Sequence, residues 1–494
     1  KPRSSTADPA TRVNIRPRAM FPLLVGVFVL SHSAWGSQQS RNGTCDVAVV
    51  GAGVGGAYAA WRAAEAGKSV CVFEMNDRPG GRIHSLRGMG PKKDLIVEAG
   101  AYRFTASMIC SKEISDHCID TPITREVVKE LNIPMAQYDP DPTQWDYEMR
   151  KLVDADGNDA GYLTLPETLL AKAAEKGAKV NYNSKVTSLA SFDNGVALTI
   201  RDGAVNVFAK AVVLNIPQGP LLKLIRHSKG AFRTIFPEPL YRPTTWDMVK
   251  LYVHYDDAWW RNDLGLKTGH FANNVAQMAS SIVTASGAQE TKVVAPLMGQ
   301  YHDGDLRCDL PEGRCRGYLQ AYYSPQGYQF FKPFHPVLGE AAVHLSHEEA
   351  DQSYLLTQIH ASLVELHREA LDAVNATERV AKMRPSSGLL SIWSEGVDGI
   401  NTGCHRHDQS DKDFMKAVLQ PFEGLPVYIA NEAYGTNTCW AEGSLNMSHR
   451  VMQALDIPVP SMPWAPLPHP SPPLDPFFLV SHSKPALAAK PVII

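Results

Sequence analysis

Apolar and polar residues alternate along the chain in blocks that predict strands and helices in turn. The first apolar strand, over residues 47–50, runs directly into a glycine-rich segment at 51–56, and an alanine-rich helix is expected over 57–66. A second apolar strand over 69–73 ends at Glu74. A strand, a glycine turn, a helix and a second strand are typical of a βαβ unit that binds a dinucleotide.

The glycine turn indicates what this unit binds. Only glycine lets the backbone turn so tightly and approach a pyrophosphate, whose charge then lies at the positive end of the helix. The acid at the end of the second strand stands close to the spacing at which a carboxylate accepts hydrogen bonds from an adenosine ribose. Glycines before a helix also occur for close packing alone, but the flanking elements favour a dinucleotide site. The residues expected to bind it are Gly51, Gly53, Gly55, Gly56 and Glu74.

A second glycine turn, flanked by Arg78 and Arg82, follows this unit and includes Gly81. A rigid guanidinium fork suits a diphosphate better than a lysine ammonium does. Nicotinamide enzymes rarely need such a second clamp. The pair of turns therefore favours a flavin dinucleotide, with Gly81 and Arg82 among its ligands.

The rest of the chain mixes strand and helix patterns. A hairpin is expected around a turn at 193–195, and the proline-rich segment 458–476 predicts a disordered tail. The other expected elements are strands at 179–183, 185–189, 209–214, 248–255 and 318–323 and a long helix at 350–375.

Two distant segments resemble one protein family. Residues 47–82 resemble the opening of the flavin-containing amine oxidases, which include L-amino-acid oxidases, monoamine oxidases and polyamine oxidases, and residues 427–444 resemble the closing motif of that family. The resemblance implies an α/β fold, in which a Rossmann-like FAD-binding domain of the glutathione-reductase type is interleaved with an α+β substrate domain. It also implies that Glu432 and the Val186 backbone contact FAD. Asn431 stands where the family usually has glycine.

The resemblance implies the order of segments as well. After a leader over 1–36, the flavin domain would comprise 44–110, 161–220 and 420–457, the substrate domain would comprise 221–419, and a tail would follow over 458–494. The substrate-side segment 111–160 is shorter than in relatives, which place a long helical segment over the substrate entrance there. Either the cavity is unusually open or part of the gene is missing.

Four residues are candidates for the chemistry through the same resemblance. Arg103 matches the arginine with which L-amino-acid oxidases hold the substrate carboxylate, and Tyr301 falls where they place a second carboxylate-binding hydroxyl. Lys250 occupies the place of a lysine that holds a water against the flavin N5, and Trp440 would wall the substrate cavity. The first three have a simpler alternative: a structural arginine, an ordinary strand tyrosine or a solvated strand lysine. Cys404 lies near the cysteine that monoamine oxidases join to their flavin, whereas other members bind FAD without a covalent bond.

Composition fits a large enzyme rather than a nucleic-acid-binding protein. The chain has 494 residues, of which 44% are hydrophobic and 20% charged, and its net charge is only -3. No basic run with interleaved aromatic residues follows the N-terminal region, so nucleic acid is not expected as a partner.

The N-terminal region predicts export. Arginines precede an apolar run over 20–30, small residues follow it, and Ala34-Trp35-Gly36 is the expected site of signal-peptide cleavage. The run is too short for a stable membrane span. An organelle transit peptide and an uncleaved signal anchor are the alternatives.

The cysteines agree with export to a secreted or endomembrane compartment. Cys110 with Cys118 and Cys308 with Cys315 are close enough in sequence to close short disulfide loops, whereas Cys71, inside a strand, is expected to be a buried free thiol. No pair has the C-x-x-C spacing of a zinc site, so no metal is expected. Glycosylation sequons begin at residues 42, 375 and 446.

Together these features predict an exported FAD-dependent oxidase of L-amino acids. Its substrates would be an amino acid and dioxygen, and its products a 2-oxo acid, ammonia and hydrogen peroxide. An amine or polyamine oxidase is the first alternative, and a secreted FAD-binding protein without turnover is the second.

Overall fold

The computed structural model describes residues 43–110, 118–192, 195–203, 205–273, 295–335, 337, 339–394, 403–408 and 411–462. The expected leader, most of the proline-rich tail and the first two residues of the 193–195 turn lie outside the described residues. The first sequon begins at residue 42, which also lies outside them.

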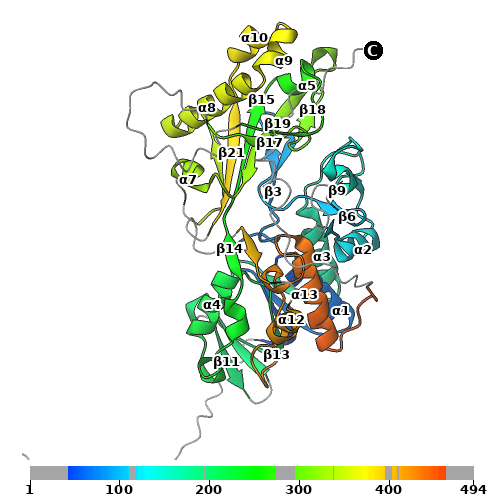
Figure 1. Cartoon of the computed structure of the whole chain (residues 1–494). Coiled ribbons are helices and arrows are strands. Elements are labelled where there is room, and N and C mark those ends of the chain that lie inside the picture. Colours follow the sequence, from blue (N-terminus) through cyan, green and yellow to red (C-terminus); the bar gives the residue numbers. More distant parts are fainter. Residues whose placement is uncertain are drawn as a thin grey trace, which may run out of the picture. The chain divides into compact units, whose positions relative to one another are not determined.

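The first sheet contains seven strands in the order β10-β2-β1-β13-β12-β11, with β23 paired to β13 (Figure 1). Its core is parallel: β1 lies between β2 and β13, and β23 and β10 extend the parallel part on either side. The expected hairpin is present, because β11 and β12 pair in antiparallel fashion. The strands are β1 (Thr44–Val50), β2 (Val70–Phe73), β10 (Lys179–Asn181), β11 (Val186–Phe192), β12 (Gly195–Ile200), β13 (Val205–Leu214) and β23 (Val427–Ile429).

Helix α1 (Val54–Glu65) packs closely against this sheet. Its alanines have no side chain beyond Cβ, so the helix can approach both the strands and its neighbours α3 (Thr164–Glu175) and α13 (Ala441–Ala454). Every residue of α1 from Val54 to Ala64 is buried. The helix N-terminus is thereby fixed at the end of β1, where the glycine turn lies.

The second sheet contains seven strands in the order β16-β17-β19-β15-β21-β20, with β18 paired to β19. Helix α8 (Ala350–Leu366) lies across it (Figure 1), and the expected long helix breaks at His367 before α9 (Arg368–Ala373). The expected strands at 248–255 and 318–323 are confirmed as β15 and β19. The strands are β15 (Met248–Tyr255), β16 (His270–Ala272), β17 (Met298–Gln300), β18 (Leu306–Arg307), β19 (Arg316–Ser324), β20 (Ala342–Leu345) and β21 (Ser387–Trp393).

Shorter elements connect the two sheets. The small strand pairs are β3 (Ser85–Met89) with β4 (Leu95–Glu98), β6 (Ile109–Cys110) with β7 (Cys118–Ile119), and β14 (Thr244–Trp246) with β22 (Cys404–Arg406), and β9 (Met149–Leu152) joins β5 (Phe104–Thr105) to β8 (Met135–Gln137). The other α-helices are α2 (Pro122–Glu130), α4 (Gln218–His227), α5 (Trp259–Asn262), α7 (Tyr328–Phe331), α10 (Thr377–Ala381) and α12 (Lys412–Leu419). This α/β architecture, with a second sheet whose strands are all paired in antiparallel fashion, is the predicted fold class; the exact domain boundaries stay a prediction.

All eight cysteines form disulfides. The two predicted short loops, Cys110–Cys118 and Cys308–Cys315, are confirmed. The prediction that Cys71 is a free thiol is wrong: it pairs with Cys45, because β1 and β2 are neighbours in the sheet and place the two Cα atoms 6.0 Å apart. The fourth disulfide joins Cys404 to Cys439.

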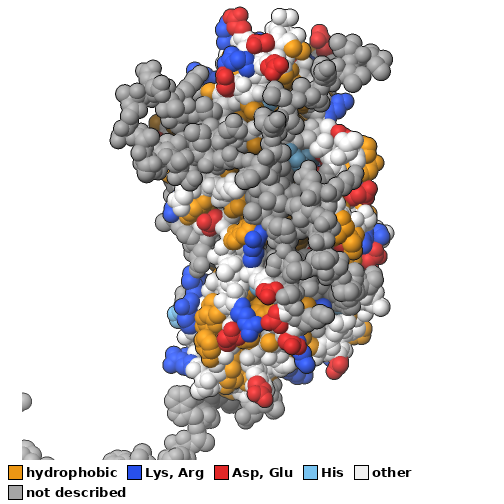
Figure 2. All heavy atoms as spheres, in the orientation of Figure 1, with side chains coloured by type: hydrophobic (Ala, Val, Ile, Leu, Met, Phe, Trp, Pro, Cys, Tyr) orange, Lys and Arg blue, Asp and Glu red, His pale blue; other side chains and the backbone are white. Residues whose placement is uncertain are grey.

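The surface and the helices add two observations. Acidic and basic side chains are interspersed on the face shown in Figure 2. Among the described residues, no helix is both long enough and apolar enough to cross a membrane.

Candidate functional site

A cavity of about 490 Å³ lies at the carboxyl ends of the parallel strands. Its wall includes the residues that follow β1, β2 and β13, namely Gly51, Glu74 and Asn215. Ligands of open α/β sheets bind at this edge, because loops leave the sheet there and helices begin. The two glycine turns of the sequence both contribute to this wall.

The first glycine turn forms an open cradle. Gly51 has a φ of +96°, which a residue with a side chain rarely adopts, and a Cβ there would collide with the Asn215 carbonyl. Gly53 is the N-cap of α1 and offers no side chain to the first amides of the helix. These amides, with the positive end of the helix dipole, remain available for an anion.

The second turn lies against the first. The Gly80 amide donates to the Ala52 carbonyl at 2.9 Å, and Gly81, with a φ of +59°, lines the cavity beside Gly53. The two signatures, separated by a helix and a strand in the sequence, therefore form one continuous backbone surface.

The remaining glycines of the first motif pack helices rather than line the cavity. A Cβ on Gly55 would collide with Ser444 of α13, and one on Gly56 would collide with the Gly51 carbonyl. Their contribution to cofactor binding is indirect, because they let α1 approach its neighbours.

Glu74 ends β2 and is almost fully buried. Its Oε2 accepts from the Ala52 amide at 2.8 Å, and its Oε1 accepts from the Asn76 amide at 2.9 Å. These bonds hold the carboxylate at the cavity wall, where a ribose hydroxyl could use its remaining lone pairs. Val186, at the start of β11, lines the same cavity.

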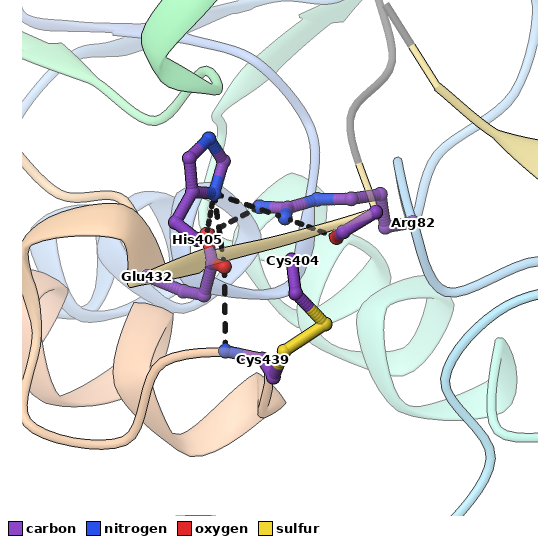
Figure 3. The surroundings of a disulfide bond; sticks show 6 residues. Arg82, Cys404, His405, Glu432 and Cys439 are labelled. Atoms are coloured by element: carbon purple, nitrogen blue, oxygen red, sulfur yellow. Dashed lines mark hydrogen bonds and ion pairs between the residues drawn. A yellow bond between two sulfur atoms is a disulfide. The ribbon is translucent and has the colours of Figure 1, made fainter. Parts of the chain in front are cut away.

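Arg82 pairs with a carboxylate in the structure, whereas the sequence predicts that it contacts a diphosphate. Its Nη2 lies 2.6 Å from Glu432 Oε2, and its Nη1 donates to the Gly403 carbonyl at 2.9 Å (Figure 3). His405 Nδ1 lies 3.0 Å from both oxygens of the same carboxylate. Burial alone would raise the pKa of Glu432, but Arg82 and His405 outweigh it and hold that pKa well below its usual range. In this structure the guanidinium therefore faces Glu432, and its expected contact with the diphosphate stays a prediction.

Lys250 lies at the other end of the cavity wall. It is 3% exposed, and its Nζ donates to the carbonyls of Glu98 at 3.1 Å and Gly100 at 2.7 Å. Burial lowers the pKa of Lys250 to about 8, while Asp303 and Glu98 oppose that shift. The lysine is thus a buried anchor between β15 and the end of β4, and the alternative of a solvated strand lysine is wrong.

Aromatic side chains surround this end of the cavity. Trp393, Tyr323 and Trp440 line it, and Trp440 is also the N-cap of α13. This placement agrees with the expected role of Trp440 as a wall.

Arg103 lies behind this wall and not among the residues that line the described cavity. Its Nη1 is 2.7 Å from Asp146 Oδ2, and both side chains are at most 4% exposed. The guanidinium also packs over the rings of Tyr102 and Tyr138. Burial would raise the pKa of Asp146, but Arg103, with His270, keeps it well below its usual range.

Tyr301 lies farther from the cavity, in the core beneath α8. Its hydroxyl is 2.7 Å from His367 Nε2, and its ring packs against Phe271. It is absent from the residues that line the described cavity. The structure therefore does not bring Tyr301 and Lys250 together.

Several residues of this region carried no signal in the sequence. Asp146, His270 and His302 place their ligand atoms within 4.8 Å of one another, a set that could hold a metal ion, although Arg103 contacts the same carboxylate. Asn215, which lies against Gly51, Gly53 and Gly55, and Cys439 were also missed. These residues come from unrelated segments, so only the fold reveals their proximity.

An uncapped helix N-terminus, a glycine cradle and an acid fit a dinucleotide, and the aromatic end of the cavity fits a flat ring. This combination defines a flavin-dependent oxidoreductase. Residues 147–320 match the family described as flavin containing amine oxidoreductase, and residues 49–115 match an NAD(P)-binding Rossmann-like domain. These two matches support an assignment of the chain to the flavin-containing amine oxidoreductases, and its cofactor is FAD.

Solved structures agree with this fold. A triple mutant of putrescine oxidase from a redesign of cofactor binding matches with a TM-score of 0.50 at 13% identity, over 84% of this chain and 99% of that chain. Wild-type putrescine oxidase bound to putrescine has a TM-score of 0.45 at 15% identity, over the same shares. At this identity the first match supports the fold alone.

Proposed function

We propose that this protein is an oxidase that removes two electrons from the carbon next to a small-molecule amine and passes them to dioxygen. The family assignment supports amine oxidation with FAD. Bound FAD would accept a hydride from that carbon, and the imine product would hydrolyse to a carbonyl compound and ammonia. Reoxidation by dioxygen would release hydrogen peroxide.

The side chains at the aromatic end would position the amine. Tyr323, Trp393 and Trp440 line the cavity and would exclude water and hold an apolar substrate against bound FAD. Lys250, anchored by two backbone carbonyls, would hold a water beside the reacting atoms.

We propose an amine without an α-carboxylate as the preferred substrate. The observation that carries this choice is the 2.7 Å ion pair between Arg103 and the buried Asp146. A substrate carboxylate would have to share the guanidinium with Asp146, and two carboxylates held close together in a buried place repel each other, which is costly. A plain amine makes no such demand.

Oxidation of L-amino acids is the second candidate. Arg103 matches the carboxylate-binding arginine of L-amino-acid oxidases, and His270 and His302 both lie within 3.3 Å of Asp146. If Asp146 turned to these histidines, its charge would stay partnered and the guanidinium fork would be available for a substrate. Tyr301 gives this candidate less support, because its hydroxyl contacts His367 and it does not line the described cavity.

A peroxide assay on the FAD-loaded protein tests both candidates. We expect release of hydrogen peroxide from amines, with lower specificity constants for the amino acids of which they are the decarboxylated forms. The opposite order would favour the L-amino-acid candidate. Absence of peroxide from every pair, with FAD bound, would favour a flavoprotein without turnover.

We also propose that the protein is exported. Four disulfides support an oxidising compartment. N-terminal sequencing of the protein from its native source should find a start close to residue 37, and an intact leader on a cytosolic protein would contradict the proposal. Asn446 is a poor glycan site, because it is 5% exposed and accepts from Arg450 Nε at 2.9 Å.

A further inference from the structure

The disulfide between Cys404 and Cys439 lies in the wall of the flavin cavity. Both cysteines line it, together with Lys250 and Trp440. The other three disulfides contribute no residue to the described lining of this cavity. Figure 3 shows the bond next to the cluster of Arg82, His405 and Glu432.

The two cysteines differ in exposure. Cys404, in β22, is 8% exposed and packs against Trp393, whereas Cys439 is exposed. A disulfide with one exposed cysteine is more readily reduced than a fully buried one, because a reductant can approach it from that side.

The surroundings favour the reduced form of this pair. Cys439 directly precedes Trp440, the N-cap of the 14-residue helix α13, and that cap makes no side-chain hydrogen bond to the helix. The positive end of a helix stabilises a thiolate and lowers the pKa of a cysteine placed there. Stabilising the thiols makes a disulfide a stronger electron acceptor.

The backbone at Cys439 adds a second factor. Its φ is +72°, in the left-handed region that residues other than glycine rarely occupy. The link to Cys404 helps to hold that conformation, so opening the disulfide lets the residue relax. Its amide lies 3.4 Å from Glu432 Oε1, and this long hydrogen bond is too weak to hold the backbone conformation alone.

We propose that Cys404 and Cys439 form a second redox centre that accepts two electrons from the reduced flavin. The S–S bond breaks and two thiols form; the two electrons and two protons come from two-electron-reduced FAD, which returns to its oxidised form. The oxidised pair also explains how Cys404 is withheld from a thioether with the flavin. The proposal rests on FAD binding and does not require an amine substrate.

Anaerobic reduction of the FAD-loaded protein with dithionite tests the proposal without any amine. Full loss of the oxidised flavin spectrum should require about two dithionite ions, or four electrons, per flavin in the wild type and about one, or two electrons, in the Cys404→Ser/Cys439→Ser variant. The matched Cys110→Ser/Cys118→Ser variant, which removes a disulfide away from the cavity, should behave as the wild type.

Thiol alkylation and mass spectrometry provide a readout that needs no variant. After anaerobic reduction, wild-type holoprotein should carry label on Cys404 and Cys439, and FAD-free protein treated in the same way should not. Equal labelling with and without FAD would overturn electron transfer from the flavin. Full flavin reduction with neither cysteine labelled would overturn the second redox centre itself, whether or not amines are substrates.

Discussion

The two ends of the cavity differ in what forms them: local backbone at one end and side chains from distant segments at the other. At the dinucleotide end, the ligand would meet backbone amides and glycines at the ends of β1 and β2, within about forty residues of sequence. At the aromatic end, Lys250, Trp393 and Trp440 come from three distant segments. The dinucleotide end therefore depends on local backbone conformation, whereas the aromatic end depends on how distant segments pack together.

The largest expected effect is at the dinucleotide end. Gly53→Asp would place a carboxylate at the N-terminus of α1, against two phosphate charges. Repulsion between like charges costs several kcal/mol, so FAD affinity should fall by on the order of 1,000-fold. Titration of the FAD-free protein with FAD, followed by fluorescence, measures this change.

Gly53→Asn is the matched control, because it adds nearly the same volume without the charge. A Cβ at this position would lie 3.2 Å from Asn215 Oδ1, so a modest loss is expected from volume alone. If both variants lose FAD equally, the helix terminus does not bind the pyrophosphate, and the contrast between the two ends weakens.

Arg103→Met should give the next largest effect, at the substrate end. It leaves Asp146 buried without its cation, which should lower the free energy of unfolding by about 3 to 4 kcal/mol. Arg103→Met/Asp146→Asn should recover much of this loss, as measured by denaturant unfolding.

The same double variant sharpens the substrate assignment. If Arg103 holds a substrate carboxylate, the specificity constant for amino acids should fall by roughly 30-fold to 1,000-fold, with little change for amines. If neither rate changes, Arg103 is structural and the amine proposal gains. The flavin spectrum should stay normal in either case.

The same contrast explains what the sequence could predict. The glycine turns, β1 and α1 follow from local backbone requirements, so their residues identified the dinucleotide end directly. Cys71 was misjudged because its partner, Cys45, is brought beside it only by the pairing of β1 with β2. Asp146 could not be assigned to Arg103 from sequence, because the bond depends on how η1 (Trp145–Glu148) packs.

Lys250→Met should have a smaller effect, at the junction of the two ends. The carbonyls of Glu98 and Gly100 would lose a buried donor, which should lower the free energy of unfolding by about 2 to 3 kcal/mol. Lys223→Met, at an exposed lysine that also lines the cavity, should change stability by less than about 0.5 kcal/mol. Equal effects of the two changes would contradict the anchoring role of Lys250.

The smallest expected effect is a pH dependence in the closing motif. Glu442 of α13 accepts from the amides of Ile123 at 3.0 Å and Thr124 at 2.9 Å. Burial raises the pKa of Glu442 from 4.5 to about 7, and these bonds oppose the shift. Between these two values the folded state therefore binds its proton more tightly than the unfolded state does, so this group's contribution to stability falls as pH rises.

Glu442→Gln removes the titrating carboxylate, so a comparison with the wild type isolates the contribution of this group to stability. The difference in unfolding free energy between wild type and variant should shift by about 1 to 2 kcal/mol between about pH 5.5 and 7, to the disadvantage of the wild type at the higher pH. Denaturant unfolding at several pH values measures the slope, and Glu175→Gln, at an exposed carboxylate, should show almost none. A flat difference for Glu442→Gln would mean that the carboxylate is ionised throughout, and that the amides of Ile123 and Thr124 outweigh burial at the place where the closing motif meets α2.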